Sequence, residues 1–270
     1  MYSRSSFAIP VLICGALLLA GCRDNPPSGN DKNSESKVEK PKKTVDRIAA
    51  DTARGIKFSD DGKMLRKYDK MLPDKEYAIP DGVTAIDNGA FIKCSNLVRV
   101  TIPDGVTSIG DGAFLGCENL TVVELPSSVT SIGAGAFANC TSLVRVTIPE
   151  GVTSIGEGAF DSCVSLTDVT IPAGVTKISN LTFTGCSNLK EVTIPASVRI
   201  IGEWSFAECR SLTGVAIPPG VKIIGRGAFE RCEKLGKITL PPSVTTIGDV
   251  AFKGCPCEEE VGRRFPNYGK

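Results

Sequence analysis

Apolar residues recur along most of this chain in a fixed order, separated by short polar stretches. In one copy of the pattern, Val100 and Ile102 flank the polar Thr101, and this alternation predicts a short strand with one buried side. Val106 and Ile109 follow and indicate a second short extended stretch with its own inward side. Each copy of the pattern therefore predicts two short strands.

Turn residues connect the two predicted strands, and a return segment follows them. Pro103 lacks a backbone N–H and ends the first strand, after which Asp104 and Gly105 turn the chain. Gly110 is expected to permit a left-handed turn after the second strand. Apolar residues at helical spacing then predict about one turn of helix that leads back to the next strand. These residues are Ala113, Phe114, Cys117 and Leu120.

The whole pattern returns at a constant interval. Pro80 and Pro103 are 23 residues apart, and each later proline of the series keeps this step. A fixed period of this length predicts a solenoid, in which each coil buries its apolar side against its neighbours. Equivalent residues of stacked coils then form ladders. The phenylalanine ladder is Phe91, Phe114, Phe137, Phe160, Phe183, Phe206, Phe229 and Phe252, and the cysteine ladder is Cys94, Cys117, Cys140, Cys163, Cys186, Cys209, Cys232 and Cys255.

Regularly spaced cysteines in an exported protein suggest disulfide bonds. Equivalent side chains of stacked coils are parallel, however, and about 4.7–4.9 Å apart, whereas a disulfide needs β-carbons about 3.8 Å apart. We therefore interpret the ladder as buried thiols that act as small apolar side chains, with chained disulfides as the alternative. The ladder lacks the close cysteine pairs of zinc sites, so no metal is predicted. Cys255-Pro256-Cys257 is interpreted as part of the carboxyl-terminal cap, and a redox or metal role for Cys257 is the alternative.

Residues 1–22 are predicted to be an export signal that ends in a lipidation site. Arg4 gives a positive start, and residues 7–19 form an apolar run too short for a resident membrane helix. Leu19-Ala20-Gly21-Cys22 resembles a bacterial lipobox, in which a signal peptidase cuts before the cysteine and the new terminus is acylated. The alternative is an ordinary secretory signal with a chance cysteine. By resemblance to Gram-negative lipoproteins, Arg23 favours the outer membrane.

The rest of the chain is predicted to contain a tether, an amino-terminal capping segment, the repeats and a carboxyl-terminal cap or tail. Residues 23–50 are polar, mixed in charge and poor in large apolar groups, which predicts a disordered tether. Residues 51–76 are predicted to be an amino-terminal capping segment for the open first coil, with a hairpin that turns at Asp61-Gly62. Eight repeats occupy residues 77–257, and the charged residues 258–270 form a carboxyl-terminal cap or tail.

Composition argues against several classes of function. Lys and Arg number 31 and Asp and Glu 30, so the chain lacks the basic excess of a nucleic-acid-binding protein. It contains no histidine, the commonest general base and metal ligand. We identify no catalytic carboxylate pair, nucleophile elbow or phosphate-binding loop, and Gly110-Asp111-Gly112 is a turn of the repeat. The sequence therefore predicts a protein without enzymatic activity, cofactor or metal.

The repeat Leu-x-x-Val-x-Ile-Pro-x-x-Val-x-x-Ile-Gly-x-x-Ala-Phe-x-x-Cys resembles the leucine-rich repeats of BspA-like bacterial surface proteins. This resemblance implies an α/β, horseshoe-like leucine-rich-repeat solenoid, with short parallel strands stacked coil on coil and short helical returns. It also implies surface display and adhesion to host or matrix proteins. Ser179 and Trp204 depart from the repeat at glycine positions, and Ser205 replaces the alanine. We expect local repacking there, or, for Trp204, an exposed contact.

The outward positions of the first strand in each coil are the candidate partner-binding face. In leucine-rich-repeat proteins the parallel sheet often lines the binding surface, which is what the resemblance contributes. The alternative is that threonine simply suits strands and that the charges are solvated. The predicted binding residues are Arg99, Thr101, Val122, Glu124, Arg145, Thr147, Asp168, Thr170, Glu191, Thr193, Lys237 and Thr239.

Two functional hypotheses follow. The first is a lipid-anchored cell-envelope protein, at the outer membrane or cell surface, that binds an unknown protein or glycan ligand of a host or matrix through its solenoid faces. The second is a periplasm-facing structural or envelope-assembly scaffold with the same fold. Neither hypothesis involves nucleic acid, and the sequence leaves open the ligand and the side of the membrane.

Overall fold

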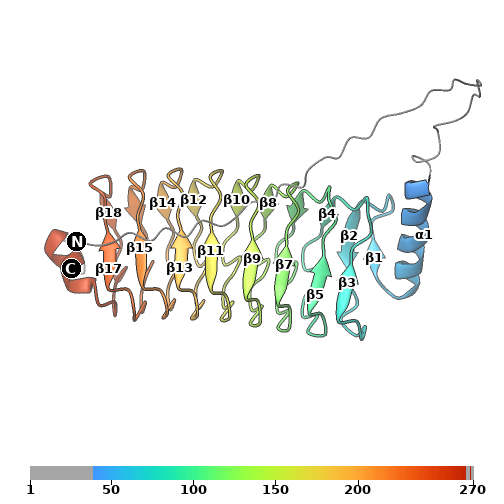
Figure 1. Cartoon of the computed structure of the whole chain (residues 1–270), viewed down its shortest axis with the longest axis horizontal. Helices are drawn as coiled ribbons and strands as arrows, with labels where there is room; N and C mark the ends of the chain where they lie inside the picture. The colour runs from blue at the N-terminus through green and yellow to red at the C-terminus, as the bar shows by residue number, and fades with distance from the viewer. Residues whose placement is uncertain (1–38, 266–267, 269–270) are drawn as a thin grey trace, which may run out of the picture. The chain divides into compact units, whose positions relative to one another are not determined.

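The computed structural model describes residues 39–265 and residue 268. The predicted export signal, the lipidation site Cys22 and the first part of the predicted tether lie outside these residues. Residues 39 to 265 contain a row of stacked coils with a helix at each end, coloured from blue to red in Figure 1. In this view the row is nearly straight and does not show the curvature of a horseshoe.

A helix precedes the coils where a tether was expected. Helix α1 spans Glu39–Ala53, so the prediction of disorder up to residue 50 is wrong for residues 39–50. The helix is fastened by polar groups, which hydrophobic patterning does not detect. Asp51 is 2% exposed, and its carboxylate accepts hydrogen bonds from the Tyr77 hydroxyl at 2.8 Å and from Arg47 Nε at 3.1 Å. Burying a carboxylate with such partners ties the helix to the first repeat.

The predicted hairpin of the capping segment is confirmed. Strands β1 (Lys57–Phe58) and β2 (Met64–Lys67) pair antiparallel. The turn contains Gly62 with φ of +68°, a conformation that glycine adopts readily. Strand β2 then pairs in parallel with β4 (Ala85–Ile86), so the hairpin starts the sheet that the repeats continue.

The first strands of successive coils lie side by side in parallel. Each is three residues long, with the middle residue directed into the interior and its two neighbours outward. Their register follows the repeat, so that Val100 pairs with Val123 and Val123 with Val146. These strands are β3 (Glu76–Ala78), β5 (Arg99–Thr101), β7 (Val122–Glu124), β9 (Arg145–Thr147), β11 (Asp168–Thr170), β13 (Glu191–Thr193), β15 (Gly214–Ala216) and β17 (Lys237–Thr239).

The second strands form another side of the coil in the same way. After β4 they are β6 (Ser108–Ile109), β8 (Ser131–Ile132), β10 (Ser154–Ile155), β12 (Lys177–Ile178), β14 (Ile200–Ile201), β16 (Ile223–Ile224) and β18 (Thr246–Ile247). Their sheet is interrupted once, between β10 and β12.

This interruption has a local cause at Ser179. The neighbouring coils have glycine there, packed so closely on the preceding coil that a β-carbon on Gly156 would lie 2.4 Å from the Ala134 backbone nitrogen. The β-carbon of Ser179 requires the backbone to stand farther off. Its hydroxyl instead donates to the Ile155 carbonyl oxygen at 2.7 Å, the acceptor that a backbone N–H serves in adjacent coils. Ser179 thus keeps a hydrogen bond to the Ile155 carbonyl oxygen, but the sheet pairing between β10 and β12 is lost.

The return segments contain consecutive turns and no regular helix, which corrects the expected helical returns. Ala113 N–H donates to the Gly110 carbonyl three residues back, and Phe114 N–H donates to Ala136 in the next coil. The left-handed residues of this segment are Gly112 and Gly116, with φ of +57° and +73°, and not Gly110 as expected. Gly110 is required for a different reason, because a β-carbon there would lie 2.6 Å from the backbone of the preceding coil.

The interior is filled by the phenylalanine ladder. Successive rings are stacked with centroids 4.8 Å apart for Phe91 and Phe114 and 5.4 Å apart for Phe160 and Phe183. Each ring is fully buried, a burial that contributes on the order of 2–3 kcal/mol per side chain. A tyrosine ring lies at each end of the stack. The ring centroids are 5.3 Å apart for Tyr68 and Phe91 and 6.1 Å apart for Tyr268 and Phe252.

The cysteine ladder consists of buried free thiols, as interpreted from the sequence. The Cys117 thiol donates to the Phe91 carbonyl oxygen at 3.0 Å, and the contact recurs coil after coil up to Cys255. Burial raises the pKa of the Cys163 and Cys186 thiols well above the ordinary value of 9.0. Because the thiolate is the nucleophile and the metal ligand, these thiols are chemically quiet structural groups.

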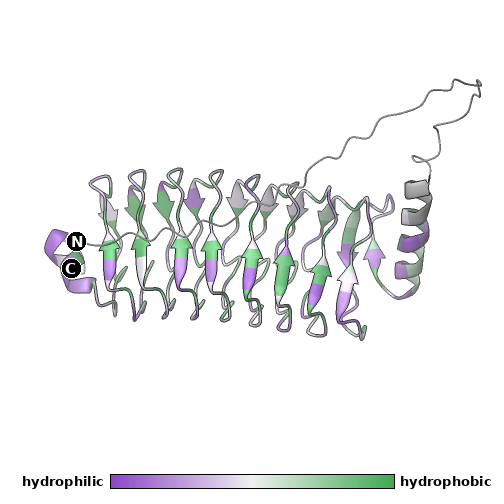
Figure 2. Cartoon of the chain, viewed as in Figure 1, coloured by the Kyte–Doolittle hydropathy of each residue, from purple (hydrophilic) through white to green (hydrophobic). Residues whose placement is uncertain are grey.

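Helix α2 (Glu258–Arg264) closes the carboxyl-terminal end of the row. It is mostly hydrophilic (Figure 2), but its Val261 is 2% exposed and joins the core. The Tyr268 hydroxyl accepts a hydrogen bond from the Phe252 N–H at 2.7 Å. Neither described helix has the length and apolar character needed to cross a membrane.

Candidate functional site

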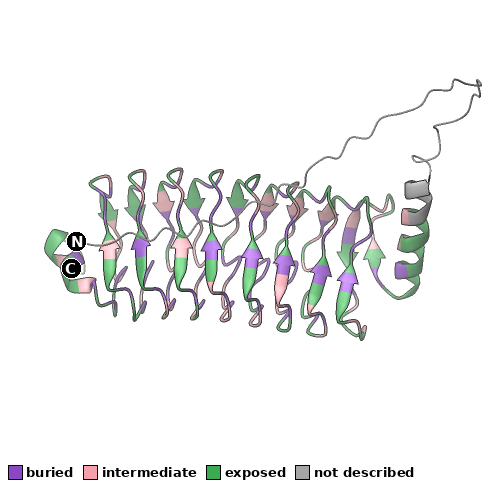
Figure 3. Ribbon diagram, in the orientation of Figure 1, coloured by how far each residue is buried: buried purple, intermediate pink, exposed green. Residues whose placement is uncertain are grey.

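The strand face is the surface formed by the outward side chains of β5, β7, β9, β11, β13 and β17, which carry all the predicted binding residues. Exposed and buried residues alternate along these strands (Figure 3). Of the predicted binding residues, only Val122 is half-buried, and the others are exposed. The predicted residues lie in two rows, because outward residues of β5, β7 and β9, of β11 and β13, and of β15 and β17 pair with their equivalents in the next coil. The ladder of first strands is interrupted between β9 and β11 and between β13 and β15.

The first row contains Arg99, Val122 and Arg145, then Asp168 and Glu191. Its charge therefore changes sign along the solenoid. Lys237 resumes the positive charge after Gly214, its register partner. The second row contains mainly threonine and is interrupted by Glu124, the partner of Thr101 and Thr147.

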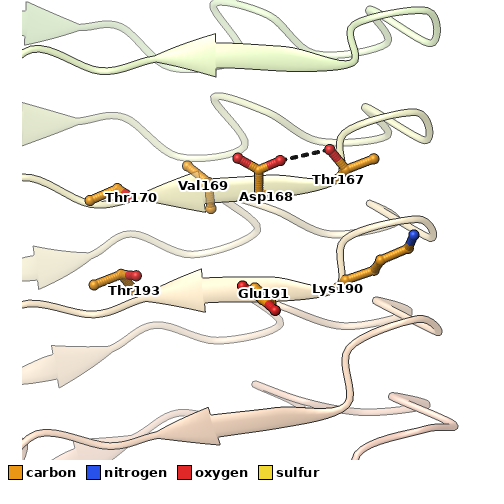
Figure 4. A pocket seen from close by; sticks show the side chains of 7 residues that line it. All are labelled: Thr167, Asp168, Val169, Thr170, Lys190, Glu191 and Thr193. Carbon is orange, nitrogen blue, oxygen red and sulfur yellow. Dashed lines mark hydrogen bonds between the residues drawn. The ribbon is translucent and has the colours of Figure 1, made fainter. Parts of the chain in front are cut away.

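A shallow depression of about 460 Å³ lies on the strand face between β11 and β13. The predicted residues Asp168, Thr170, Glu191 and Thr193 line it, together with Thr167, Val169 and Lys190, which the sequence analysis did not select. Figure 4 shows this surface, with the side chain of Lys190 extending away from Glu191. Thr167 and Lys190 immediately precede β11 and β13. They occupy equivalent positions in two successive repeats, and this equivalence could have indicated that both lie on the same surface.

Two carboxylates on neighbouring strands line this depression. Asp168 and Glu191 are register partners on neighbouring parallel strands, a spacing of about 4.8 Å. Asp168 accepts a hydrogen bond from the Thr167 hydroxyl at 2.8 Å. Among the described residues, neither carboxylate has a cation within ion-pair distance. Like charges at directly opposite positions destabilise a sheet, so the fold gains nothing from this pair.

A smaller depression of about 70 Å³ lies between β5 and β7 and is lined by the predicted residues Arg99, Thr101, Val122 and Glu124. Its lining thus includes one basic and one acidic side chain, in contrast to the two acidic side chains between β11 and β13. No group of three or more potential metal ligands occurs among the residues that the structure describes. The strand face therefore offers charged and hydroxyl groups for contact with a partner.

Comparison with protein families identifies the repeat. The model of the BspA type leucine rich repeat region matches residues 73–189 and 153–261, with 6 copies. The chain belongs to the BspA-type leucine-rich-repeat family. The family predicted from the repeat is thereby confirmed, and so is the solenoid fold class with its stacked parallel strands.

Solved structures of bacterial leucine-rich-repeat proteins are similar to this chain. The T. pallidum leucine-rich-repeat protein is 29% identical over 79% of this chain and 92% of its own, with a TM-score of 0.56. One from Eubacterium ventriosum is 28% identical over 74% of this chain and 48% of its own, with a TM-score of 0.56. One from Bacteroides ovatus is 30% identical over 67% of this chain and 58% of its own, with a TM-score of 0.41. This chain thus spans about half the length of the last two. No curated protein matches it.

Proposed function

We propose that this BspA-type solenoid is a non-enzymatic protein of the bacterial cell envelope that binds a macromolecular partner through its strand face. The observation that carries the proposal is the unpaired carboxylate pair of Asp168 and Glu191, exposed in a depression of about 460 Å³. A charge arrangement that costs stability is retained more readily where it serves binding. The family's association with surface recognition supports the same direction.

The charges along the strand face indicate which chemical groups a partner would carry. Asp168 and Glu191 would attract basic groups, while Arg99 and Arg145 would attract acidic ones. A partner with both kinds of group, spaced along its length, would contact several coils at once. Such a surface is typical of a protein segment in an extended conformation, and we propose a host or matrix protein as the ligand.

Binding is tested with the purified chain and immobilised matrix proteins, glycans and intact cells. The variant Asp168→Asn/Glu191→Gln removes both charges without changing shape. We expect binding to a protein target to weaken about tenfold or more, since each close charge pair contributes on the order of 1.5 kcal/mol or more. Binding of the unmodified chain should also weaken with added salt, because the contacts are exposed.

A matched control separates this effect from net charge. Ser154→Lys/Thr246→Lys changes the net charge by the same amount on the second strands, where both residues are exposed. This control should bind as the unmodified chain does. Equal binding by the two variants, or no binding to any of the targets, would contradict the proposal.

We further propose that an acyl chain on Cys22 anchors the protein. The support is the lipobox-like Leu19-Ala20-Gly21-Cys22 that follows an apolar run. Metabolic labelling with a fatty acid should mark the protein, and Cys22→Ala should abolish the label and release the chain from the membrane fraction. Retention of the label in Cys22→Ala would refute the anchor without affecting the binding proposal.

The periplasm-facing scaffold is the second candidate. The described fold supports it equally, because stacked coils can organise envelope components as well as host proteins. Protease treatment of intact cells distinguishes the two: a surface-displayed chain is cleaved, and a periplasmic one is protected until the outer membrane is permeabilised. We expect cleavage in intact cells.

A further inference from the structure

A second candidate site lies on the return face, which we define as the surface of the turn segments that follow each second strand. A depression of about 250 Å³ spans successive coils there. Its lining includes Leu181, Trp204, Glu208, Glu230 and Arg231. None of these residues belongs to the strand face, so this depression is separate from the surface proposed above.

The depression coincides with a departure from the repeat. Every coil has a left-handed residue at the position of Gly112, and glycine occupies it in five coils. Leu181, with φ of +59°, and Trp204, with φ of +49°, occupy it in two consecutive coils. A left-handed residue with a β-carbon costs about 1–2 kcal/mol. Val250 is the remaining exception, and it does not line the depression.

Trp204 is held in a defined position. Its indole lies over Gly227, where a β-carbon would collide with Cδ1 and Nε1 of the ring. The Arg226 guanidinium lies 5.4 Å from the ring centroid, within cation–π distance. The ring is only half-buried, and its N–H has no hydrogen-bond acceptor among the described residues. Packing over Gly227 explains the ring's position, but it explains neither the strained Leu181 nor the free N–H.

Polar groups at the rim complete the site. The Glu230 carboxylate is half-buried and has no partner within the described part of the chain. The exposed Arg231 guanidinium lies 3.7 Å from Glu208, which also accepts a hydrogen bond from Arg210 at 3.0 Å. The carboxylates of Glu208 and Glu230 and the guanidinium groups of Arg226 and Arg231 balance in charge. A strongly charged ligand is therefore not favoured.

We propose that this depression binds a neutral saccharide. A sugar ring has an apolar C–H face that can pack on the indole and Leu181, and hydroxyl groups that can both donate to Glu230 and accept from Arg231. The volume of about 250 Å³ is below the roughly 300–1,000 Å³ of pockets for drug-sized ligands. One ring of an oligosaccharide fits the depression, while its neighbours extend over the return face.

The test uses Trp204 as its own reporter, because it is the only tryptophan in the chain. The purified protein is titrated with neutral hexasaccharides of glucose, mannose, galactose and N-acetylglucosamine. At least one should change the tryptophan emission saturably and protect the indole from quenching by acrylamide. No change with any of the four at millimolar concentration would overturn the proposal, as would protection by a peptide but by no saccharide.

Variants that keep the tryptophan locate the binding site. Leu181→Gly and Glu230→Gln should each weaken binding at least tenfold, a loss of about 1.4 kcal/mol. Val250→Gly removes the same kind of strained residue outside the depression and should bind normally, as should Asp168→Asn/Glu191→Gln on the strand face. Unchanged binding in both Leu181→Gly and Glu230→Gln would place the saccharide elsewhere and refute the site. If circular dichroism shows that these variants are unfolded, acrylamide protection in the native protein decides the question.

Discussion

The strand face and the return face are made by the same repeat but accommodate change differently. On the strand face, Arg99, Val122, Asp168 and Lys237 occupy equivalent positions, and each remains in an extended strand. Their side chains point away from the interior, so exchanging them leaves the backbone unaltered. Charge can therefore vary from coil to coil at little cost to the fold.

The return face follows a stricter rule because its backbone is left-handed at two positions in every coil. Glycine satisfies that conformation without strain, and other residues do so at a cost. A departure from the repeat on the return face is consequently more informative than one on the strand face. Leu181 and Trp204 are departures that strain the backbone. The charge changes on the strand face cause no such strain, and they indicate function only where like charges lie on neighbouring strands.

Both faces are held in place by the shared interior. Alkaline pH should destabilise that interior, with the largest expected change in the free energy of unfolding. The pKa of the Cys94 thiol is raised from 9.0 to about 12, mainly by burial. Hydrogen bonding with Cys232 is the first cause that raises the pKa of Cys255 to about 12. Between pH 9 and 12 the unfolded chain loses thiol protons that the folded chain keeps, so the free energy of unfolding falls as pH rises.

Each thiol whose pKa burial or a neighbouring thiol raises contributes up to about 1.4 kcal/mol per pH unit to that decline, and these thiols together several kcal/mol. Urea unfolding followed by circular dichroism at pH 8, 9, 10 and 11 measures it. The variant Cys163→Ala/Cys186→Ala should be less stable at pH 8 but lose less stability by pH 11. An identical decline in the variant would show that other groups cause it.

Removing one interior ring should affect both faces nearly as strongly. Phe160 is fully buried between Phe137 and Phe183, each with a centroid 5.4 Å away. Phe160→Ala should lower the free energy of unfolding by about 3–5 kcal/mol through lost burial and a cavity. Denaturant unfolding measures the change, and a loss below about 1 kcal/mol would mean that the stacked coils collapse around the gap.

A pair of substitutions tests the contrast between the faces directly. Gly135 on the return face has φ of +58°, and a β-carbon there would contact only the Ala138 β-carbon, at 3.9 Å, so Gly135→Ala introduces backbone strain without a close clash. It should cost about 1–2 kcal/mol. Thr147→Val on the strand face is exposed and already extended, and should change stability by less than about 0.5 kcal/mol. Equal costs at the two positions would show that the two faces tolerate substitution alike.

The smallest expected effect is a gain in stability. The Ser205 hydroxyl is buried and has no hydrogen-bond partner among the described residues. Ser205→Ala restores the residue of most repeats and should stabilise the chain by about 1 kcal/mol. Thr182 occupies the same place in the preceding coil, but its hydroxyl donates to the Ser179 carbonyl at 2.7 Å. Thr182→Ala should therefore destabilise, and thermal unfolding of both variants checks the opposite signs.

Residue patterning predicted the strand face well and the ends of the solenoid poorly. A constant period makes residues 23 positions apart spatial neighbours, so the rows from Arg99 to Lys237 could be assigned before any coordinates. Helix α1 (Glu39–Ala53) escaped prediction because it is fastened by Asp51 and its partners and lacks a strong apolar stripe. The Tyr77 hydroxyl and Asp51 are far apart in sequence, and no local pattern links them.

The sequence by itself determined the repeat, its interior ladders and the residues that face outward, because periodic burial is encoded in the spacing of apolar side chains. Only the tertiary structure decided the path of the return segments. There Gly110 lies against the preceding coil while Gly112 is left-handed, so two glycines that look alike in sequence serve different needs. The physical reason is that backbone contact between coils depends on the neighbouring coil's position, which no single copy of the repeat contains.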